Sequence, residues 1–541
     1  MSKPELADYT TAHEQFDLAE LDQEFVGNFA QGINACIECC DRYTGDGRIA
    51  LYWEAADGSS GDVSFDDLQK RAARFANLLT AKGIGPGDCV AGLLPRIPQL
   101  LTVIFGTIRA GAIYQPLFTA FGPKAIAQRV HGSGAKLIVT NAANRSKLDD
   151  VEACPPVAVA GGGAIPGDIE LESILDEQSE VFEPVMRRGD DLFLKLFTSG
   201  TTGVPKGVGI PLTALRANWV YMHYGLDLRL EDKFWNIADP GWAYGLYHGV
   251  IGPLLLGHAT LFHEAPFSVD ETCATIRKHN ITNLAGAPTA YRMLIAAGDE
   301  VPNQLRGRLR VASSAGEPLN PEVVRWFAER LGCTLKDQYG QTEMAMMLMN
   351  HHGLSHPERL GSAGLAMPGF ALAVVDEAGS PVAAGQHGIL AVVRSQSPLF
   401  FFPGYSGREG QDWLGDYYLT GDMVEQGEDG AISFVGRADD VISSAGYRIG
   451  PFDVESCLLE HLAVRESAVV GKPDDERGHI VKAFVVLSDG YAASEAISED
   501  LRLHVRHRLG GHAYPREISF VAELPKTPSG KIQRFLLRQQ A

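Results

Sequence analysis

The sequence lacks an apolar run long enough to cross a membrane, and its N-terminus, MSKPELADYTTAHEQ, lacks the apolar core of a signal peptide. These two absences argue against an integral membrane segment and a secretory leader, so we expect a cytoplasmic protein. Cysteine is also scarce, with eight in 541 residues. Cys36, Cys39 and Cys40 cluster, but no second pair stands at zinc-ligand spacing. Reduced structural thiols are therefore expected in preference to a metal or redox site.

Positive charge is in short supply as well. Lysine and arginine number 47 against 67 aspartates and glutamates, and the net charge of −20 argues against a nucleic-acid-binding surface. Residues 501–541 are the exception, with a net charge of +6. They hold Glu517 and Glu523 against eight basic side chains: Arg502, Arg506, Arg508, Arg516, Lys526, Lys531, Arg534 and Arg538. The excess fits contact with a phosphorylated small molecule, and a solvated basic face explains it equally well.

The chain is too long for one ordinary hydrophobic core, so a large and a smaller region are expected. Strand-like and helix-like segments alternate across residues 60–340, which predicts α/β layers with parallel sheets. Within this part, Ser64 to Asp67 forms a capping box that opens a helix. From about residue 365, short alternating strands separated by turn residues predict a β-rich subdomain.

The pattern changes again after residues 437–440. Strand-like segments at 466–471 and 481–487 and a helix near 496–509 predict a small α+β domain. We therefore expect an N-terminal domain over residues 1–437 and a C-terminal domain over residues 438–541.

Residues 196–208, LFTSGTTGVPKGV, carry the strongest local signal. An apolar strand opens into small and hydroxyl residues ahead of Pro205-Lys206-Gly207: Thr198, Ser199, Gly200, Thr201, Thr202 and Gly203. Small residues let backbone N–H groups approach a phosphate, hydroxyls add donors, and the lysine adds charge. The segment is therefore predicted to bind a polyphosphate, with a mobile Ser/Thr/Gly linker as the alternative. It is not a Walker A loop, because Gly-Lys-Ser/Thr does not follow its first glycine at the required spacing.

Further motifs follow in order. They are Ala315-Gly316-Glu317-Pro318, the DQYGQTE of residues 337–343, the YLTGD of 418–422, the GRADDVISSAGYRIG of 436–450 and the PKTPSGK of 525–531. Together with the phosphate loop, they resemble the adenylate-forming (ANL) superfamily of acyl-CoA synthetases, adenylation domains and luciferases. The resemblance is greatest to the AMP-forming acetyl- and medium-chain acyl-CoA synthetases.

The resemblance implies a reaction in two halves that uses ATP, Mg²⁺ and CoA. A carboxylate attacks ATP to give acyl-AMP and pyrophosphate, and the CoA thiolate then displaces AMP. The implied catalytic residues are Lys531, Glu343, Thr198 and Thr342, with Glu343 as the Mg²⁺ ligand. Asp422 is implied to hold both ribose hydroxyls and Tyr339 to stack on adenine. The implied nucleotide-binding residues are Thr198, Ser199, Gly200, Thr201, Thr202, Gly203, Lys206, Gly316, Glu317, Pro318, Asp337, Gln338, Tyr339, Gly340, Gln341, Thr342, Asp422, Arg437 and Arg448.

The resemblance also implies a mobile C-terminal domain that rotates about a hinge at residues 437–440, matched by Asp439. Lys531, in the loop 525–531, would bridge the substrate carboxylate and the α-phosphate in the first half-reaction and then leave. Gly446, beside Tyr447, would then line the path of the CoA arm. The P-x-x-x-x-G-K pattern ending at Lys531 resembles a site for a lysine acyltransferase, opposed by a deacylase, and acylation would remove the charge that adenylation needs.

The acyl substrate is the least determined feature. Acetyl-specific relatives carry a tryptophan just before QTE, where this chain has Gly340, so an open pocket floor is expected. Trp242, Tyr244 and Met344 are expected to line the pocket, although the aromatic pair and a Met-rich helix after residue 343 could equally be core. Straight or modestly branched acids longer than acetate are predicted, with aryl acids as an alternative.

Three rival functions share these motifs. An adenylation enzyme could load a separate carrier protein in place of CoA, and a luciferase-type oxygenase uses the same adenylation residues. A non-catalytic nucleotide or acyl sensor is disfavoured because Glu343, Asp422, Arg437 and Lys531 are all present.

Overall fold

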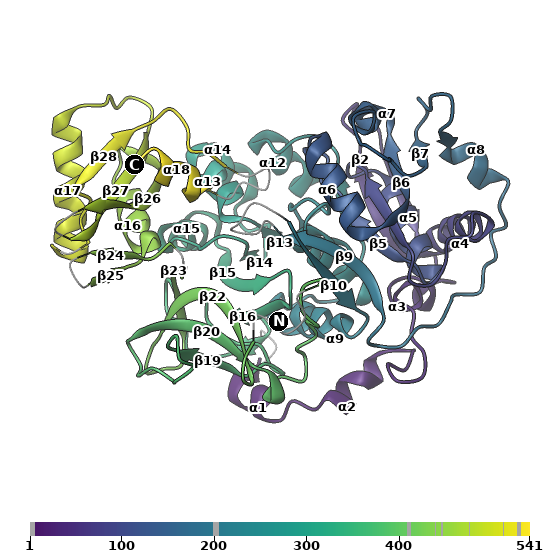
Figure 1. The fold of residues 1–541 in the computed structure, drawn as a ribbon, viewed down its shortest axis with the longest axis horizontal. Coiled ribbons are helices and arrows are strands. Elements are labelled where there is room, and N and C mark those ends of the chain that lie inside the picture. Colours follow the sequence, from purple (N-terminus) through teal and green to yellow (C-terminus); the bar gives the residue numbers. More distant parts are fainter. Residues whose placement is uncertain are drawn as a thin grey trace.

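The computed structural model describes residues 6–198, 205–407, 413–438, 440–444, 447–474, 477–511, 513–526 and 532–541. Parallel α/β layers occupy the centre and right of Figure 1, a β-rich part lies below, and the C-terminal part lies at upper left. The expected mixed α/β architecture with parallel sheets is confirmed.

The first large sheet has seven strands, and all of its neighbouring pairs but one are parallel. Its order is β10 (Lys206–Pro211), β9 (Leu192–Thr198), β5 (Ile113–Pro116), β4 (Cys89–Leu93), β6 (Ala135–Asn141), β7 (Val157–Ala160) and β8 (Ile169–Glu170). The exception is β9 with β10, which are antiparallel, so the predicted phosphate loop joins the two strands of a hairpin.

Helices α4 (Phe65–Ala81), α5 (Pro98–Arg109) and α6 (Pro123–Ser133) alternate with these strands. The predicted cap of α4 is confirmed, because the Ser64 hydroxyl accepts the Asp67 N–H at 3.0 Å. Helices α4 and α5 approach so closely that a Cβ at Gly106 would lie 2.6 Å from the Phe75 Cβ.

The second sheet has six strands in the order β11 (Phe234–Asn236), β13 (Asn283–Gly286), β14 (Val311–Ser314), β15 (Thr334–Gln341), β16 (Ala345–Met349) and β18 (Leu365–Ala366). The first four strands are parallel and the last two antiparallel. Its helices are α12 (Val269–Lys278), α13 (Pro288–Ala296), α14 (Glu300–Leu305) and α15 (Pro321–Trp326). The expected Met-rich helix after residue 343 is wrong: these residues form β16, because they pair with β15 and are buried on both faces.

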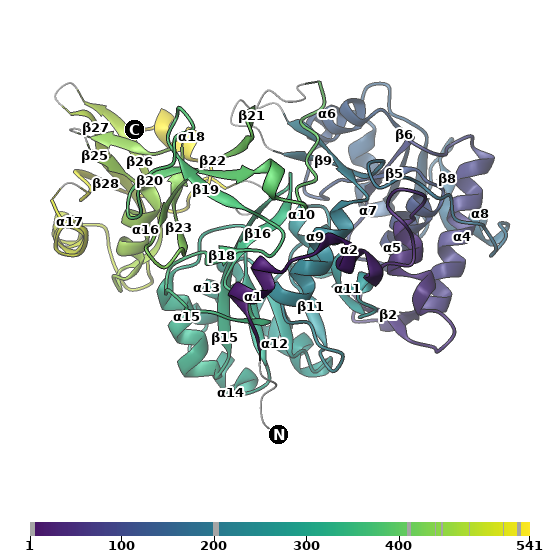
Figure 2. The ribbon, with the colours of Figure 1, turned by 90° about the horizontal axis from the view of Figure 1, so that it is seen from below.

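A three-stranded sheet of β12 (Thr260–His263), β2 (Ile49–Glu54) and β3 (Ser60–Ser64) adjoins the two large ones. Between β11 and β12 the chain forms α10 (Ala243–Leu246), a wider turn at Tyr247–Ile251 and α11 (Gly252–Leu255), and α9 (Ala214–Val220) precedes β11. Near the N-terminus, α1 (Tyr9–Glu14) and α2 (Leu18–Leu21) cross the underside of the molecule (Figure 2). The remaining short elements are β1 (Ala7–Asp8), β17 (Leu354–Ser355), α3 (Ala35–Cys39), α7 (Ala142–Arg145) and α8 (Leu171–Asp176).

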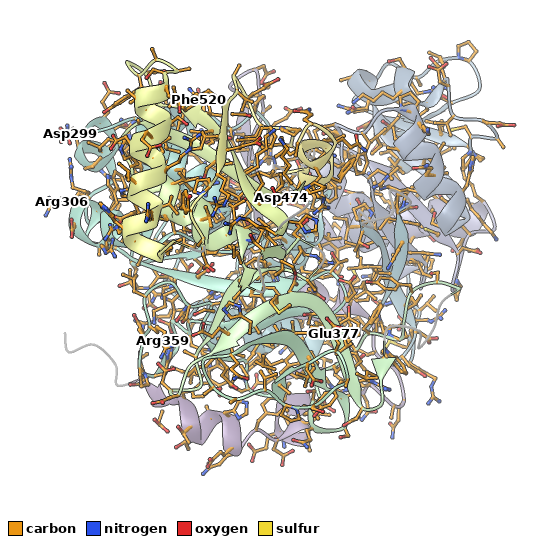
Figure 3. All side chains as sticks on the ribbon, turned by 60° about the vertical axis from the view of Figure 1, so that its left-hand side comes forward. Asp299, Arg306, Arg359, Glu377, Asp474 and Phe520 are labelled. Atoms are coloured by element: carbon orange, nitrogen blue, oxygen red, sulfur yellow. The ribbon has the colours of Figure 1, made fainter. Side chains whose placement is uncertain are left out.

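The β-rich part is an antiparallel sheet of β19 (Leu372–Val375), β20 (His387–Val393), β22 (Tyr417–Gln426), β21 (Trp413–Leu414) and β23 (Ile432–Arg437). In Figure 3, Glu377 marks this part, and Arg359, which pairs with its Asp429, lies beside it; both lie below Asp474 and Phe520 of the C-terminal part.

The C-terminal part has a sheet of its own, composed of β25 (Tyr447–Ile449), β24 (Ile442–Ser444), β27 (Gly478–Leu487), β26 (Val464–Asp474) and β28 (Glu517–Phe520). Its helices are α16 (Pro451–Leu459), α17 (Glu495–Leu509) and α18 (Arg534–Gln539), and its two hydrophobic clusters contain only residues after 441. The boundary at 437–440 stays a prediction. No helix in the described ranges is long and apolar enough to span a membrane.

Candidate active site

Four of the predicted segments begin at the carboxyl ends of parallel strands. The phosphate loop follows β9, the segment with Trp242 follows β11, Ala315–Pro318 follows β14, and Thr342–Glu343 follows β15. Carboxyl ends of parallel strands share one edge of a sheet, where backbone N–H groups and loop side chains are free to meet a ligand. These four segments, which are far apart along the sequence, therefore lie at the carboxyl edges of two sheets.

Tyr339, Gln341, Asp422 and Arg437 form a hydrogen-bonded group that we call the ribose-side cluster. The Tyr339 hydroxyl and the Gln341 amide, at 2.9 Å, both donate to Asp422 Oδ2, while Arg437 Nη1 donates to Oδ1 at 3.2 Å. Asp422 and Arg437 are cross-strand partners on β22 and β23, and the other two come from β15. The Asp422 carboxylate, which is 4% exposed, thus accepts hydrogen bonds from three donors, one of which, Arg437, is positively charged.

Local backbone shape helps to position this carboxylate. Gly421 has φ of +74°, and a Cβ there would lie 3.2 Å from Arg437 Nη2. Glycine accepts this left-handed conformation without penalty, which lets β22 turn Asp422 toward Arg437. Burial, together with the negative charge of Asp422, raises the pKa of Tyr339 well above its usual value, so the phenol stays a donor.

Glu343 lies in a second group, connected to the phosphate hairpin. The Tyr405 hydroxyl donates to Glu343 Oε1 at 2.6 Å, and Lys206 Nζ lies 4.5 Å from the centre of the Tyr405 ring. Lys206 opens β10 and is the cross-strand partner of Thr198, so both ends of the hairpin are fixed in register. Tyr405 therefore bridges the carboxylate expected to bind Mg²⁺ and the lysine expected to face phosphate.

The segment Ala315–Pro318 is the turn between β14 and α15. Glu317 is anchored to α13, because its carboxylate accepts the Thr289 hydroxyl at 2.9 Å and pairs with Arg292 at 3.1 Å. Asp337 accepts the Leu319 N–H at 3.3 Å and the Gln338 N–H at 3.0 Å. Loss of hydration raises the pKa of Asp337 to about 8, and no described cation pairs with it.

Gln338 is placed differently from its neighbours. Its side chain is 2% exposed and points into the core, where its oxygen accepts the Tyr221 hydroxyl and its amide donates to the Gly225 carbonyl at 3.1 Å. A nucleotide contact at this position is therefore left to the backbone.

The expected acyl-pocket residues Trp242, Tyr244 and Met344 have different surroundings in the described structure. Trp242 packs on Phe118 and Phe121 at ring separations of 5.4 and 5.3 Å and lines a small cavity that also includes Thr342. The Tyr244 ring lies 5.9 Å from the ring of the buried His248, whereas Met344 is fully buried. The Tyr244 hydroxyl has no hydrogen-bond partner among the described residues.

The expectation of an open floor at Gly340 stays a prediction. A Cβ at this position would lie 2.2 Å from the Ala345 carbonyl oxygen and 2.7 Å from the Met346 Cα. The register shifts between Tyr339 and Gly340, and this brings the backbone of β16 against the glycine. On this backbone a side chain at position 340 would therefore collide with the main chain of β16.

Comparison with known proteins connects this geometry to a family. Residues 40–405 match the family described as AMP-binding enzyme, and residues 453–531 match the AMP-binding enzyme C-terminal domain. The chain belongs to the AMP-binding enzyme family.

Individual relatives cover nearly the whole chain. The acetyl-coenzyme A synthetase of Bacillus subtilis (strain 168) is 35% identical over 98% of this chain and 95% of its own. The mitochondrial acyl-coenzyme A synthetase ACSM4 of Rattus norvegicus is 36% identical over 91% and 86%. The crystal structure of Brucella canis acyl-CoA synthetase is 57% identical, covers 99% of both chains and superposes with a TM-score of 0.81. This AMP-binding enzyme is an ATP-dependent, AMP-forming acid–thiol ligase of the acyl-CoA synthetase type.

Several expected residues of this AMP-binding enzyme lie outside the described residues. They are Ser199, Gly200, Thr201, Thr202, Gly203, Asp439, Gly446 and Lys531. Tyr447 and Arg448 belong to β25, but their side chains are also outside the description. Their roles stay predictions.

The basic C-terminal residues of the enzyme are explained by ion pairs. Five of the eight pair with carboxylates of the same region: Arg502 with Glu499, Arg508 with Glu460, Lys526 with Glu466, Arg534 with Glu455 and Arg538 with Asp440. Most of the local excess is therefore neutralised within the C-terminal part itself.

Two side chains near the site were not anticipated from the sequence. Tyr405 belongs to no motif, and only its contact with Glu343 reveals it. Arg129 has a weak sequence signal, since it shares the buried face of α6 with Ile126 and Val130, spaced as on one side of a helix.

Proposed function

We propose that this enzyme joins a carboxylic acid to CoA through an acyl-adenylate, with ATP converted to AMP and pyrophosphate. The observation that supports this most directly is the convergence of the phosphate hairpin, Glu343 and the ribose-side cluster at the edges of two sheets. Adenylation requires no acylated side chain. It requires that the acid and the α-phosphorus be aligned and that negative charge be neutralised.

We propose the following roles for the individual residues. Asp422 accepts the ribose hydroxyls, Arg437 holds that carboxylate charged, and the Tyr339 ring stacks on adenine. Thr198 and Thr342 contact phosphate oxygens from the ends of β9 and β15. Lys531, carried by the domain 438–541, supplies the cation that bridges acid and α-phosphate before that domain turns about residues 437–440.

Mg²⁺ fits the donors present. Glu343 is 6% exposed and oriented by Tyr405, and Mg²⁺ typically binds one or two carboxylates together with substrate phosphates. We propose that Glu343 holds the ion, whose bound charge offsets that of the phosphates.

The proposed acids are straight or modestly branched and longer than acetate. The chain has Gly340 in place of an indole before QTE, which leaves room for an acyl chain longer than acetate. Trp242 and Tyr244 supply the side-chain walls, and their aromatic faces would also accept an aryl acid.

A panel of C2 to C10 and aryl acids, scored by CoA-dependent AMP release, tests the proposal. We expect the highest kcat/KM for an acid between C3 and C10, and a preference for acetate would contradict the proposed pocket. Purified carrier protein offered beside CoA distinguishes the carrier-loading alternative. An intact AMP signal without thioester, accompanied by oxygen uptake, would indicate the oxygenase alternative.

Regulation at Lys531 is proposed on charge alone. Acylation would neutralise the ammonium group that adenylation needs. Full activity of enzyme stoichiometrically acylated at Lys531 would contradict both the regulation and the catalytic role.

A further inference from the structure

Arg129 is a buried cation that has no carboxylate partner among the described residues. It lies on α6 at 7% exposure, and its only described hydrogen bond runs from Nη1 to the Ala125 carbonyl at 2.9 Å. Arg109, the other arginine in the described ranges that is comparably buried, at 5%, pairs with Asp41 at 2.8 Å. No carboxylate of the described chain pairs with Arg129.

The groups around Arg129 do not compensate for the missing carboxylate. Its guanidinium lies 4.1 Å from the centre of the Phe121 ring, which offsets only part of the lost hydration. Burial lowers the pKa of Arg129 to about 10, so the group is still charged at neutral pH. A buried charge that is neither paired nor neutralised is unfavourable, and natural proteins keep one where a ligand completes it.

The position of Arg129 indicates which ligand that is. Arg129 lines a small cavity, which we call the arginine cavity. Its walls include Phe121, Leu196, Phe197, Trp242 and Thr342. Leu196 and Phe197 directly precede Thr198 and the phosphate loop in the sequence. Thr342 belongs to the DQYGQTE segment.

We propose that Arg129 is an anion-binding residue of the active site that holds a phosphate oxygen of ATP and of the leaving pyrophosphate. The inference rests on the proposed ATP-dependent adenylation. In that step a carboxylate oxygen forms a bond to the α-phosphorus, the bond from that phosphorus to the bridging oxygen breaks, and the electron pair leaves with pyrophosphate. Charge grows on the leaving group, and a guanidinium fork is well matched to such an oxyanion.

Arg129→Gln, Arg129→Lys and a control, Lys124→Gln, test this. Lys124 is exposed on the same helix, so its variant removes the same charge without touching the cavity. ATP–pyrophosphate exchange gives the KM for ATP, pyrophosphate and acid, AMP inhibition reports the rest of the nucleotide site, and acyl-AMP plus CoA isolates the second half-reaction. We expect Arg129→Gln to raise the KM for ATP and pyrophosphate at least tenfold, with AMP inhibition and thioester formation changed less than twofold.

The other outcomes separate the alternatives. A selective rise in the KM for the acid would mean that the anion is the substrate carboxylate, and unchanged or uniformly altered constants would mean that Arg129 binds no ligand group. If Arg129→Gln does not fold, the same comparison in Arg129→Lys decides, because a lysine keeps the charge but loses the two-pronged contact. Wild-type enzyme without ATP–pyrophosphate exchange would instead overturn the proposed function.

Discussion

The ribose-side cluster and the phosphate side of the site treat charge in opposite ways. In the ribose-side cluster, Asp422 already has Arg437 and two neutral donors around it. On the phosphate side, Arg129 and Lys206 have aromatic rings beside them and no described carboxylate within ion-pair distance. One side is internally neutralised, and the other carries cations that a polyanion would neutralise.

Because of this difference, substitutions on the two sides should affect stability and catalysis differently. Removing a member of a satisfied, buried group leaves its partners without hydrogen bonds, so both folding and binding are weakened. Removing a cation that lacks a partner weakens the reaction and leaves the fold unchanged or more stable. Substitutions on the two sides should therefore differ in whether thermal stability changes together with activity.

The largest effect is expected for Lys531→Ala. Loss of the cation that bridges acid and α-phosphate should lower acyl-AMP formation roughly 10²- to 10³-fold, the range for removing one preorganised charge stabiliser. Thioester formation from supplied acyl-AMP should be retained, since that half-reaction does not use the lysine. ATP–pyrophosphate exchange and acyl-AMP turnover, measured separately, check this.

Lys206→Ala is the matched control for that experiment. It removes one cation from the hairpin, where the side chain rests on Tyr405, and should weaken adenylation less than Lys531→Ala does. Equal loss of both half-reactions in Lys531→Ala would contradict the assigned role. A melting temperature that falls in Lys206→Ala would contradict the distinction between the two sides.

Asp422→Asn should lower both activity and stability. The amide cannot hold Arg437 by charge or accept from every donor, and hydrogen bonds to a charged group contribute about 1.5–3 kcal/mol. We expect the KM for ATP to rise by roughly 10- to 100-fold, with a lower melting temperature. Glu428→Gln, an exposed change in the turn between β22 and β23, is the control. An unchanged melting temperature in Asp422→Asn would contradict the proposed difference between the ribose-side cluster and the phosphate side.

Much of this site could be predicted from the sequence because its motifs are local. The cap at Ser64, the strand before Thr198 and the order of the nucleotide motifs each depend on neighbours along the chain. The four segments at strand ends follow from alternating strands and helices, since parallel strands align their carboxyl ends.

The remainder depends on contacts between distant parts of the chain. Tyr405 reaches Glu343 from 62 residues away, and whether a described carboxylate reaches Arg129 depends on all the segments packed around α6. The Met-rich segment favours helix by composition, but pairing with β15 makes it a strand, and tertiary context overrides such propensities. That same pairing places the main chain of β16 so close to Gly340 that a Cβ there would collide with it.

Gly340→Ala tests how rigidly the ribose-side cluster is built. Its Cβ would meet the Ala345 carbonyl oxygen at 2.2 Å, so β16 must move, and β15 carries Tyr339 and Gln341 on either side. Overpacking of this kind costs about 1–3 kcal/mol, visible as a lower melting temperature with a raised KM for ATP. Gly85→Ala is the control, because its Cβ meets nothing within 4 Å. Wild-type stability in Gly340→Ala would show that this wall yields easily.

The smallest effect is expected for Asp337→Asn, which replaces a buried carboxyl that has no described partner of opposite charge. Lost hydration raises the pKa of Asp337 from 3.8 to about 8, so the folded protein keeps the carboxyl protonated where the unfolded chain ionises it. Its contribution to stability therefore declines as pH rises from about 4 to about 8 and is constant above that. Asp337→Asn should reduce the loss of unfolding free energy between pH 6 and pH 9 by about 1 kcal/mol, after allowance for relaxation, and the melting temperature should fall less over that range. The fully exposed Asp489→Asn should leave this slope unchanged, and any pH-independent offset in Asp337→Asn would report only its hydrogen bonds to Leu319 and Gln338. A slope identical to wild type would mean that the carboxyl is ionised in the folded enzyme, with a partner for its charge on the adenine side as Asp422 has on the ribose side.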